Sequence, residues 1–340
     1  MGKVAIIGKG TIGKRAIAVA PVYGHEVALI VGRKGIMRPD GTQLLPFGPA
    51  IASDLASICR SNGIRRVMIA IPSGGTGEVE ADYINAAAAV DCRIVTAGKS
   101  ALANQFDLIE SNMSKVAFDA ACGAGAMIPS FLDEILFVHP AHPFVLTAVM
   151  NGTLNYAQSR VPDAVGREQI VDECESQGFC EPAEPGKVLT CHAMYNAEFD
   201  DLSRKIAILG NTRLRKLFGR TVTQDDFEPS EFTEDDLLRV TAGNSMYRYL
   251  VRICVNPKDL EYFADIEVGG RICARIGDVS VVAGFVQLTG ALLKWVPNHV
   301  GNAVHLIQNG DSDLRVGQGA GPVPTVGAMF SNLRRFDRVA

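Results

Sequence analysis

The stretch Lys3–Gly13, KVAIIGKGTIG, decides the fold of this chain of 340 residues. An apolar run of strand length leads directly into three glycines with the spacing G-x-G-x-x-G, and a helical pattern continues over Thr11–Ala20. A second apolar strand, Glu26–Gly32, completes the unit within about 30 residues. A strand, this glycine spacing and a helix, in this order, predict a dinucleotide-binding turn.

Each glycine of the motif has its own steric role in such a turn. Gly8 allows the tight bend, Gly10 lets the backbone approach a pyrophosphate, and Gly13 lets the helix pack close to the strand. The N-terminus of the helix offers amides and a positive dipole end to the phosphates. A purely structural strand–helix turn is the alternative. Cofactor contacts are predicted here and after the third strand, at Gly8, Gly10, Thr11, Ile12, Gly13, Pro72 and Ser73.

The alternation of strands and helices continues through the first hundred residues. Helical patterns cover Ile51–Ser61 and Glu78–Ala89, and apolar runs of strand length cover Val67–Ile71 and Arg93–Thr96. Strands that are apolar throughout, with helices between them, predict a parallel sheet covered on both faces. The predicted fold class is α/β, with a Rossmann-type parallel-sheet domain and a second, α+β domain.

The character of the sequence changes from about Phe118, where a glycine-rich ACGAG is followed by long helical stretches. Antiparallel strands are predicted at Tyr247–Val255 and Glu267–Ala274, continuing through Val279–Gly284, and the C-terminus returns to glycine-rich loop and helix. We therefore predict a dinucleotide-binding domain over residues 1–125 and 310–340, and a second domain over 126–309.

The composition excludes several classes of protein. Lys and Arg number 33 against 37 Asp and Glu, a net charge of −4 without a basic run, so no nucleic-acid partner is expected. Hydrophobic residues make up 47% and charged residues 21%, which suffices for a large core. No apolar stretch reaches about 18 residues, and the chain begins in a strand rather than in a signal peptide, so no membrane partner is expected.

The eight cysteines lie between Cys59 and Cys273 without a C-x-x-C pair. In a chain of this size they predict reduced thiols and a cytoplasmic protein. The pairs Cys191–His192 and His139/His142 lack a second pair at zinc-site spacing, so ordinary packing is preferred and no metal site is predicted.

Two cations follow the second strand, Arg33 and Lys34 in VGRKG. An NAD site usually has Asp or Glu at this distance from the motif, to bind the ribose 2′-hydroxyl. Two cations without a carboxylate instead suit a 2′-phosphate and predict NADP. A solvated basic loop is the alternative.

Asp201 and Lys205 share one face of a predicted helix because they are four residues apart. They could form an ordinary exposed ion pair. However, Ile208 falls beside them and an apolar stripe borders them on the other side, which indicates partial desolvation. Three residues make up that stripe: Leu202, Ile206 and Leu209. A partly desolvated amine is a candidate proton donor.

Segments spread over most of the chain resemble homoserine dehydrogenases in sequence, order and spacing. They are GKGTIGKR at the start, VTAGKSALA at 95–103, ACGAGAMIP at 121–129, NGTLNY at 151–156, SQGFCEPAEP at 176–185, DDLSRKIAIL at 200–209 and GQGAGPVPT at 317–325. The chain resembles the minimal form of that family, without a kinase or a C-terminal regulatory domain.

The resemblance implies roles for several residues. Lys205 would be the general acid/base and Asp201 would position it or the substrate. Lys99 would lie near nicotinamide and substrate, although the family's preceding Asn is Gly98 here. Glu181 would hold the substrate's amino group. Gly152 and Thr153 would line the substrate pocket. The loop Gly319–Gly321 would contact the cofactor, with Gly321 as the binding residue.

The segment before the lysine helix departs from the family pattern. It is longer, and Asn196 stands where the family has an Asp in the substrate site. Glu184 and Glu198 are the nearest carboxylates that could replace that charge. Asp119 stands where Glu is usual, and Phe199 where Gly is usual.

The predicted activity is NADP-dependent interconversion of L-homoserine and L-aspartate 4-semialdehyde by hydride transfer. The alternatives are an oxidoreductase for a different small hydroxy or aldehyde compound, and a dinucleotide-binding protein without catalysis. The resemblance also implies that the domain over 126–309 binds the substrate and forms a homodimer, through the strands near 247–255 and 267–284. It further implies a monovalent cation near the glycine-rich turn.

Overall fold

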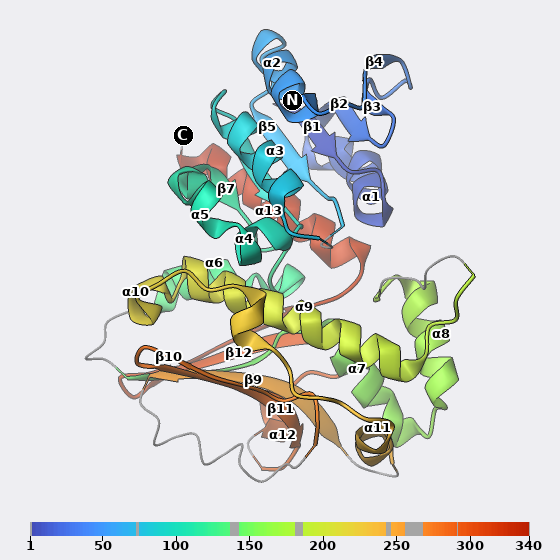
Figure 1. Ribbon diagram of the computed structural model, residues 1–340, viewed down its shortest axis with the longest axis vertical. Coiled ribbons are helices and arrows are strands. Elements are labelled where there is room, and N and C mark those ends of the chain that lie inside the picture. Colours follow the sequence, from blue (N-terminus) through green and yellow to red (C-terminus); the bar gives the residue numbers. More distant parts are fainter. Residues whose placement is uncertain are drawn as a thin grey trace. The chain divides into compact units, whose positions relative to one another are not determined.

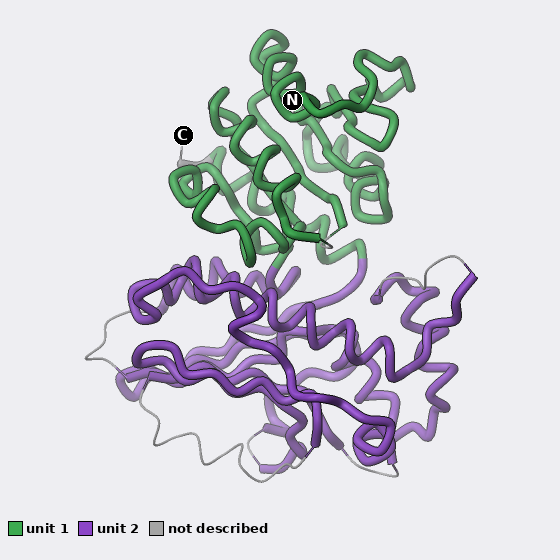
Figure 2. The backbone as a smooth tube through the Cα atoms, viewed as in Figure 1, with its two compact units in different colours: residues 1–121, 322–340 green, residues 122–321 purple. Residues whose placement is uncertain are grey.

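The computed structural model describes residues 2–72, 75–136, 143–180, 186–242, 246–255, 268–290 and 292–339. The chain divides into two compact units (Figure 2), Met1–Ala121 with Pro322–Ala340, and Cys122–Gly321. The chain therefore returns to the first unit at residue 322, and not at residue 310 as the sequence analysis predicted.

A twisted sheet forms the centre of the first unit. Over the described residues its order is β4-β3-β2-β1-β5-β6-β7. The strands β1, β2, β5, β6 and β7 are parallel, whereas β3 and β4 extend the sheet as an antiparallel hairpin. The bounds are β1 (Gly2–Ile7), β2 (His25–Gly32), β3 (Gly35–Met37), β4 (Gln43–Pro46), β5 (Arg66–Ile69), β6 (Arg93–Thr96) and β7 (Val116–Ala117).

Helices cover this sheet on both faces, as Figure 1 shows, and the α/β fold class is confirmed. The helix pairs α1 with α13 and α2 with α3 pack against each other. The helices are α1 (Thr11–Val19), α2 (Ile51–Ser61), α3 (Glu78–Ala88), α4 (Ser100–Asn104), α5 (Phe106–Ile109) and α13 (Pro322–Val339), with the 3-10 helices η1 (Ala20–Tyr23) and η2 (Glu110–Lys115). Val4, Ala5 and Ile6 are wholly buried, as the continuous apolar run requires.

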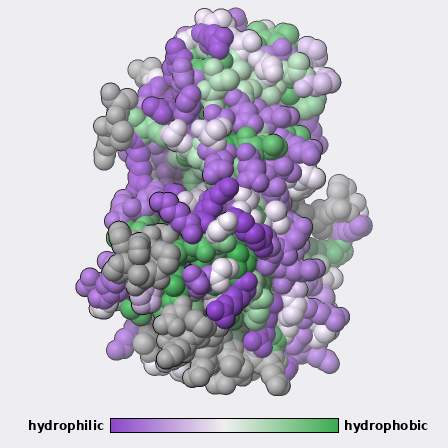
Figure 3. Space-filling model, turned by 60° about the vertical axis from the view of Figure 1, so that its left-hand side comes forward, coloured by the Kyte–Doolittle hydropathy of each residue, from purple (hydrophilic) through white to green (hydrophobic). Residues whose placement is uncertain are grey.

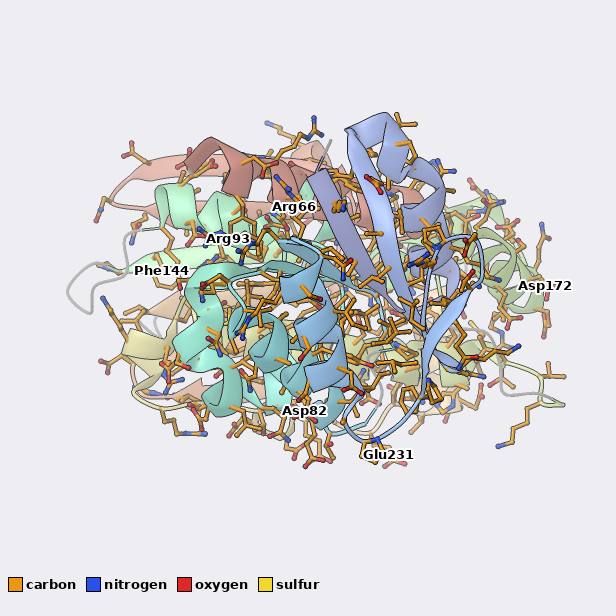
Figure 4. The ribbon with its side chains drawn as sticks, turned by 90° about the horizontal axis from the view of Figure 1, so that it is seen from above. Arg66, Asp82, Arg93, Phe144, Asp172 and Glu231 are labelled. Atoms are coloured by element: carbon orange, nitrogen blue, oxygen red, sulfur yellow. The ribbon has the colours of Figure 1, made fainter. Side chains whose placement is uncertain are left out.

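Polar contacts tie the returning helix α13 to the first unit. Arg66, which pairs in register with Arg93 at the start of the neighbouring strand (Figure 4), forms an ion pair of 2.5 Å with Asp337. At the other end, the Asn332 amide donates to the buried Asp119 carboxylate at 2.6 Å. Asp119, where the resemblance has a Glu, thus anchors α13.

The second unit is built on an antiparallel sheet, which over the described residues has the order β10-β11-β9-β8-β12-β13. Its strands are β8 (Phe144–Val149), β9 (Tyr247–Val255), β10 (Ile272–Ile276), β11 (Val279–Gln287), β12 (Gly301–Gln308) and β13 (Asp311–Gln318). Its helices are α6 (Ile128–Ile135), α7 (Gly152–Arg160), α8 (Arg167–Gln177), α9 (Cys191–Thr212), α10 (Arg215–Phe218), α11 (Glu234–Thr241) and α12 (Leu292–Trp295), with η3 (Ala124–Ala126), η4 (Val161–Asp163) and η5 (Gln224–Phe227).

The long helix α9 crosses one face of this sheet (Figure 1). Its Phe199 packs edge-on against Phe285 and at 5.1 Å from the ring of Tyr249, so the residue that replaces the family's Gly belongs to the core. On the opposite face, Leu292 and Trp295 pack on Val149 and Leu250.

The prediction that residues 310–318 belong to the first domain is wrong. They form β13, which pairs with β12 from Asp311 to Gln318. Leu314 and Val316 alternate with polar residues, the pattern of a half-exposed edge strand, but the glycines around them favoured a loop. The strand predicted at 267–274 runs instead from Ile272 to Ile276, and residue 267 lies outside the described residues.

The described helices include none with the length and apolar character needed to cross a membrane. Hydrophilic side chains cover most of the face drawn in Figure 3, and hydrophobic ones gather in smaller areas.

Candidate active site

The glycine turn of the first unit has the predicted steric design. Gly8 has φ +102°, and a Cβ built on it would overlap the carbonyl oxygen of Ala70. A Cβ on Gly13 would overlap the Gly8 carbonyl, so α1 can approach β1 only with glycine there. Around Gly10 nothing lies within 4 Å of the Cβ position. The turn is therefore closed where the backbone packs and open where a phosphate would approach.

Arg33 and Lys34 occupy the turn between β2 and β3, where both side chains are exposed. A third cation lies close by that the sequence analysis missed. Lys9 extends over Gly32, and its Nζ lies 4.0 Å from the Met37 sulfur. The signal was weak because Lys9 stands at a variable position of the motif.

The other predicted cofactor residues are placed as follows. Thr11 and Ile12 form the first turn of α1, and Pro72 follows β5 in an exposed position, while Ser73 lies outside the described residues. Lys99 is half-buried at the start of α4. Gly321, at φ +94°, ends the second unit immediately before α13.

Lys205 is the centre of a buried polar cluster in the second unit. It is 6% exposed, and its Nζ lies 2.6 Å from Asp201 Oδ2 and donates to the Met150 carbonyl at 2.7 Å. An ammonium group is costly to bury, and these two acceptors offset that cost. The desolvation that the apolar neighbours indicated is therefore present, and the alternative of an exposed ion pair is excluded.

Asn151 joins a second carboxylate to the cluster. Its side-chain oxygen accepts from the Leu154 amide and so caps α7, which leaves the Nδ2 group pointing at α9. That group donates to Asp201 at 3.1 Å and to Glu198 at 2.5 Å. Asp201 follows Glu198 by three residues and Lys205 follows it by seven, so all three lie on one face of α9.

Asn196 lies apart from this cluster, and its place in the substrate site stays a prediction. It precedes Lys205 by nine residues, about two and a half turns, and so falls on the opposite side of α9. Its amide donates to the His192 carbonyl at 3.2 Å. The last part of the segment that is longer than in the family, residues 191–200, belongs to the continuous helix α9, which Thr190 caps. Glu181 and Glu184 lie outside the described residues.

Gly152 and Thr153 are buried at the start of α7. A Cβ on Gly152 would come within 2.8 Å of Ala320, so the glycine admits the loop Gly319–Gly321. The Thr153 hydroxyl donates to the Phe179 carbonyl at 2.8 Å. Both residues hold neighbouring segments together beside the Asn151 cap.

Two further predictions concern bound ions. The first is a monovalent cation near the glycine-rich turn, which stays a prediction. The carbonyls of Phe118, Gly123 and Ala124 there accept hydrogen bonds from amides of the same turn. The second concerns the Cys191–His192 and His139/His142 pairs. Cys191 begins α9, and the His192 ring lies 2.6 Å from the Phe232 carbonyl oxygen. His139 and His142 lie outside the described residues, and among those that are described no group of three or more His, Cys, Asp or Glu could hold a metal.

These features define a two-unit fold with a Rossmann-type sheet and glycine turn in the first unit and a buried lysine cluster in the second. No protein-family model and no curated protein matches the sequence. Solved structures match it over the whole chain. The homoserine dehydrogenase of Thermoplasma acidophilum has a TM-score of 0.71 at 16% identity, over 99% of both chains.

Two further structures give the same result. A hyperthermophilic archaeal homoserine dehydrogenase in complex with NADPH has a TM-score of 0.63 at 15% identity, over 100% of this chain and 98% of that one. The homoserine dehydrogenase of Thiobacillus denitrificans has a TM-score of 0.59 at 19% identity, over 98% of this chain and 72% of that one. The chain thus has the fold of the homoserine dehydrogenases from end to end.

Proposed function

We propose that the protein is an NADP-dependent homoserine dehydrogenase that interconverts L-homoserine and L-aspartate 4-semialdehyde. The observation that carries the proposal is the buried Lys205, held by Asp201 and the Met150 carbonyl in a chain with this fold. A fixed, desolvated ammonium is suited to proton transfer at a substrate oxygen.

The first unit fits the dinucleotide. Gly10 leaves the approach to the α1 amides open, and three cations, Lys9, Arg33 and Lys34, surround the end of β2 where a 2′-phosphate would lie. When bound, the nicotinamide accepts or supplies the hydride of the reaction. A structural neighbour solved with NADPH supports this cofactor.

The residues around Lys205 hold and move the proton. In the oxidation direction, Lys205 as the free amine would take the proton of the substrate hydroxyl through its Nζ. In the reduction direction, the ammonium would return a proton to the forming alkoxide and stabilise its charge. Asp201 and the Met150 carbonyl fix the direction of the Nζ protons, and Asn151 holds Asp201 in turn.

Glu198 would supply the charge that Asn196 lacks. Its carboxylate reaches the same Asn151 amide as Asp201, two turns from Lys205 on the same helix face. A carboxylate at this place can pair with the ammonium group of an amino-acid substrate.

The second candidate is an oxidoreductase for a different small hydroxy compound. It is favoured by the position of Asn196, which lies across the helix from Lys205 and is bonded to His192. The two candidates are separated by following NADP+ reduction at alkaline pH with L-homoserine and with a panel of small alcohols. Preference for L-homoserine by a factor of 100 or more, about 2.7 kcal/mol, supports the first. Comparable rates with the alcohol lacking its amino group support the second.

We also propose a homodimer formed through the sheet of the second unit. Of the strands first predicted to form the contact, β9 and β11 lie inside this sheet and β10 lies at one edge. The exposed apolar side chains lie at the other edge, where Ile307, Leu314 and Val316 share one face of β12 and β13 and are 44%, 46% and 49% exposed. Apolar side chains clustered on an edge of a sheet are typical of a contact surface. Sedimentation velocity of the full chain would distinguish the dimer from a monomer.

A further inference from the structure

A second buried carboxylate lies in the first unit, outside the glycine motif. Glu80, in the first turn of α3, is 3% exposed. Its Oε1 accepts a hydrogen bond from the Thr96 hydroxyl at 2.5 Å, and its Oε2 accepts one from the Ala101 amide at 3.1 Å. Two donors on the two oxygens are the surroundings that a buried ionised carboxylate requires.

The two donors bracket the turn between β6 and α4, residues 96–101. The Gly98 amide donates to the Thr96 hydroxyl oxygen at 2.9 Å, so this hydroxyl connects Glu80 to the middle of the turn. At the start of α3, Gly77 has φ +93°, and a Cβ there would lie 2.5 Å from the Ser100 carbonyl group. The beginning of α3 therefore holds the turn at both its ends.

Gly98 shows how close this contact is. A Cβ built on Gly98 would overlap the Glu80 carboxylate. The carboxylate thus fills the space beside the turn that a side chain at position 98 would otherwise take. The carboxylate of Glu80 can therefore reach the turn only because residue 98 is a glycine.

Lys99 is the cationic residue of this turn. It is half-buried, and its neighbours in the turn touch Glu80 on both sides: the carboxylate fills the Cβ position of Gly98 and accepts from the Ala101 amide. Burial raises the pKa of Glu80, and the Thr96 hydroxyl, the Ala101 amide and the charge of Lys99 each act to lower it. A neutral acceptor could also bind the Thr96 hydroxyl, but only a carboxylate binds both donors and places a negative charge beside Lys99.

We propose that Glu80 is a positioning residue, which fixes the 96–101 turn and holds the Lys99 ammonium charged and in place. The contact itself is independent of the substrate. Its consequence for turnover rests on the proposed function, in which Lys99 lies near nicotinamide and substrate.

The test is the reactivity of Lys99 in the full-length protein carrying Glu80→Gln. Glutamine keeps the shape of the side chain and removes its charge. Competitive acetylation with acetic anhydride at a series of pH values, read by mass spectrometry of the Lys99 peptide relative to exposed Lys14, gives the pH at which Lys99 becomes reactive. Without the neighbouring charge this midpoint should fall by about one pH unit. The same variant should lose about tenfold in kcat with little change in NADPH affinity.

Glu78→Gln is the matched control, because Glu78 is exposed on the same helix turn. It should leave the Lys99 midpoint and kcat at their wild-type values. An unchanged Lys99 midpoint in folded Glu80→Gln would overturn the proposal.

If Glu80→Gln does not fold, Gly98→Ala gives an independent test. It keeps the charge, but the new Cβ displaces the carboxylate from the turn, so the Lys99 midpoint should again fall. A folded Gly98→Ala protein with the wild-type midpoint would contradict the proposal. Because the labelling needs no substrate, a failure of the proposed homoserine activity would leave this result intact.

Discussion

The glycine turn of the first unit and the lysine cluster of the second are assembled in different ways. The turn is contiguous: all three glycines lie between residues 8 and 13, and their roles are steric contacts with the adjacent backbone. The cluster joins the end of β8, the cap of α7 and one face of α9, and its central hydrogen bond connects residues 55 apart. A contiguous site depends mainly on local backbone geometry, whereas the cluster depends on tertiary packing as well.

The largest effect is expected for Lys205→Ala in the cluster. Loss of a general acid/base should lower kcat by about 10²-fold or more. NADPH affinity should barely change, because the dinucleotide motif lies in the other unit. Steady-state kinetics and NADPH fluorescence titration measure the two quantities. Lys216→Ala, at an exposed position of α10, should leave kcat unchanged, and a near-native kcat for Lys205→Ala would exclude the proposed role.

Glu198→Gln should produce the next largest effect. If Glu198 pairs with the substrate's ammonium group, kcat/KM for L-homoserine should fall by about 10- to 100-fold, mainly through KM. The alcohol lacking the amino group should show no such change. Asp200→Asn, an exposed carboxylate on the same helix, provides the control. Equal losses on both substrates would mean that Glu198 acts only through Asn151 and Asp201.

The lysine cluster also shows the limits of the sequence analysis. The i,i+4 spacing placed Asp201 and Lys205 on one face, and the apolar neighbours indicated their desolvation. The partners from outside the helix, Met150 and Asn151, could not be predicted because strand and helix come together only through packing. That Asn196 lies on the other side of the helix from Lys205 was also not predicted, because the sequence did not show that α9 begins as early as Cys191.

In the fold, too, some elements were predicted from the sequence and others were missed. In the first unit the predicted strands and long helices match the structure to within a few residues, since a buried parallel sheet has an unbroken apolar signal. The antiparallel hairpin of β3 and β4 was missed, because its strands are short. In the second unit β8 was missed, since it pairs only with the distant β9 and β12. The strands β12 and β13 form a local hairpin across Asn309 and Gly310, a turn signal that the sequence analysis did not use.

The glycine turn itself can be tested by comparing Gly13→Ala with Gly10→Ala. A methyl group at position 13 overlaps the Gly8 carbonyl, so Gly13→Ala should lower the free energy of unfolding by about 1–3 kcal/mol. Gly10 has φ −78° and open space around it, so Gly10→Ala should not destabilise the fold. It should instead weaken NADPH binding. Urea unfolding and NADPH titration measure both variants, and equal stability losses would contradict the local steric account.

The smallest effect is expected at the exposed cations beside this turn. Arg33 lies on the surface, where water and salt weaken each contact, so Arg33→Ala should reduce the preference for NADP+ over NAD+ by about tenfold, mainly through the KM for NADP+. Lys9→Gln should act in the same direction, because Lys9 extends over Gly32 toward Met37 at the same end of β2. Lys14→Gln, an exposed cation on α1, should leave the preference unchanged. Since counterions compete for a 2′-phosphate, the preference should also decline as ionic strength rises. A wild-type enzyme that uses NAD+ as efficiently as NADP+, at low and at high salt, would show that these cations do not select the cofactor.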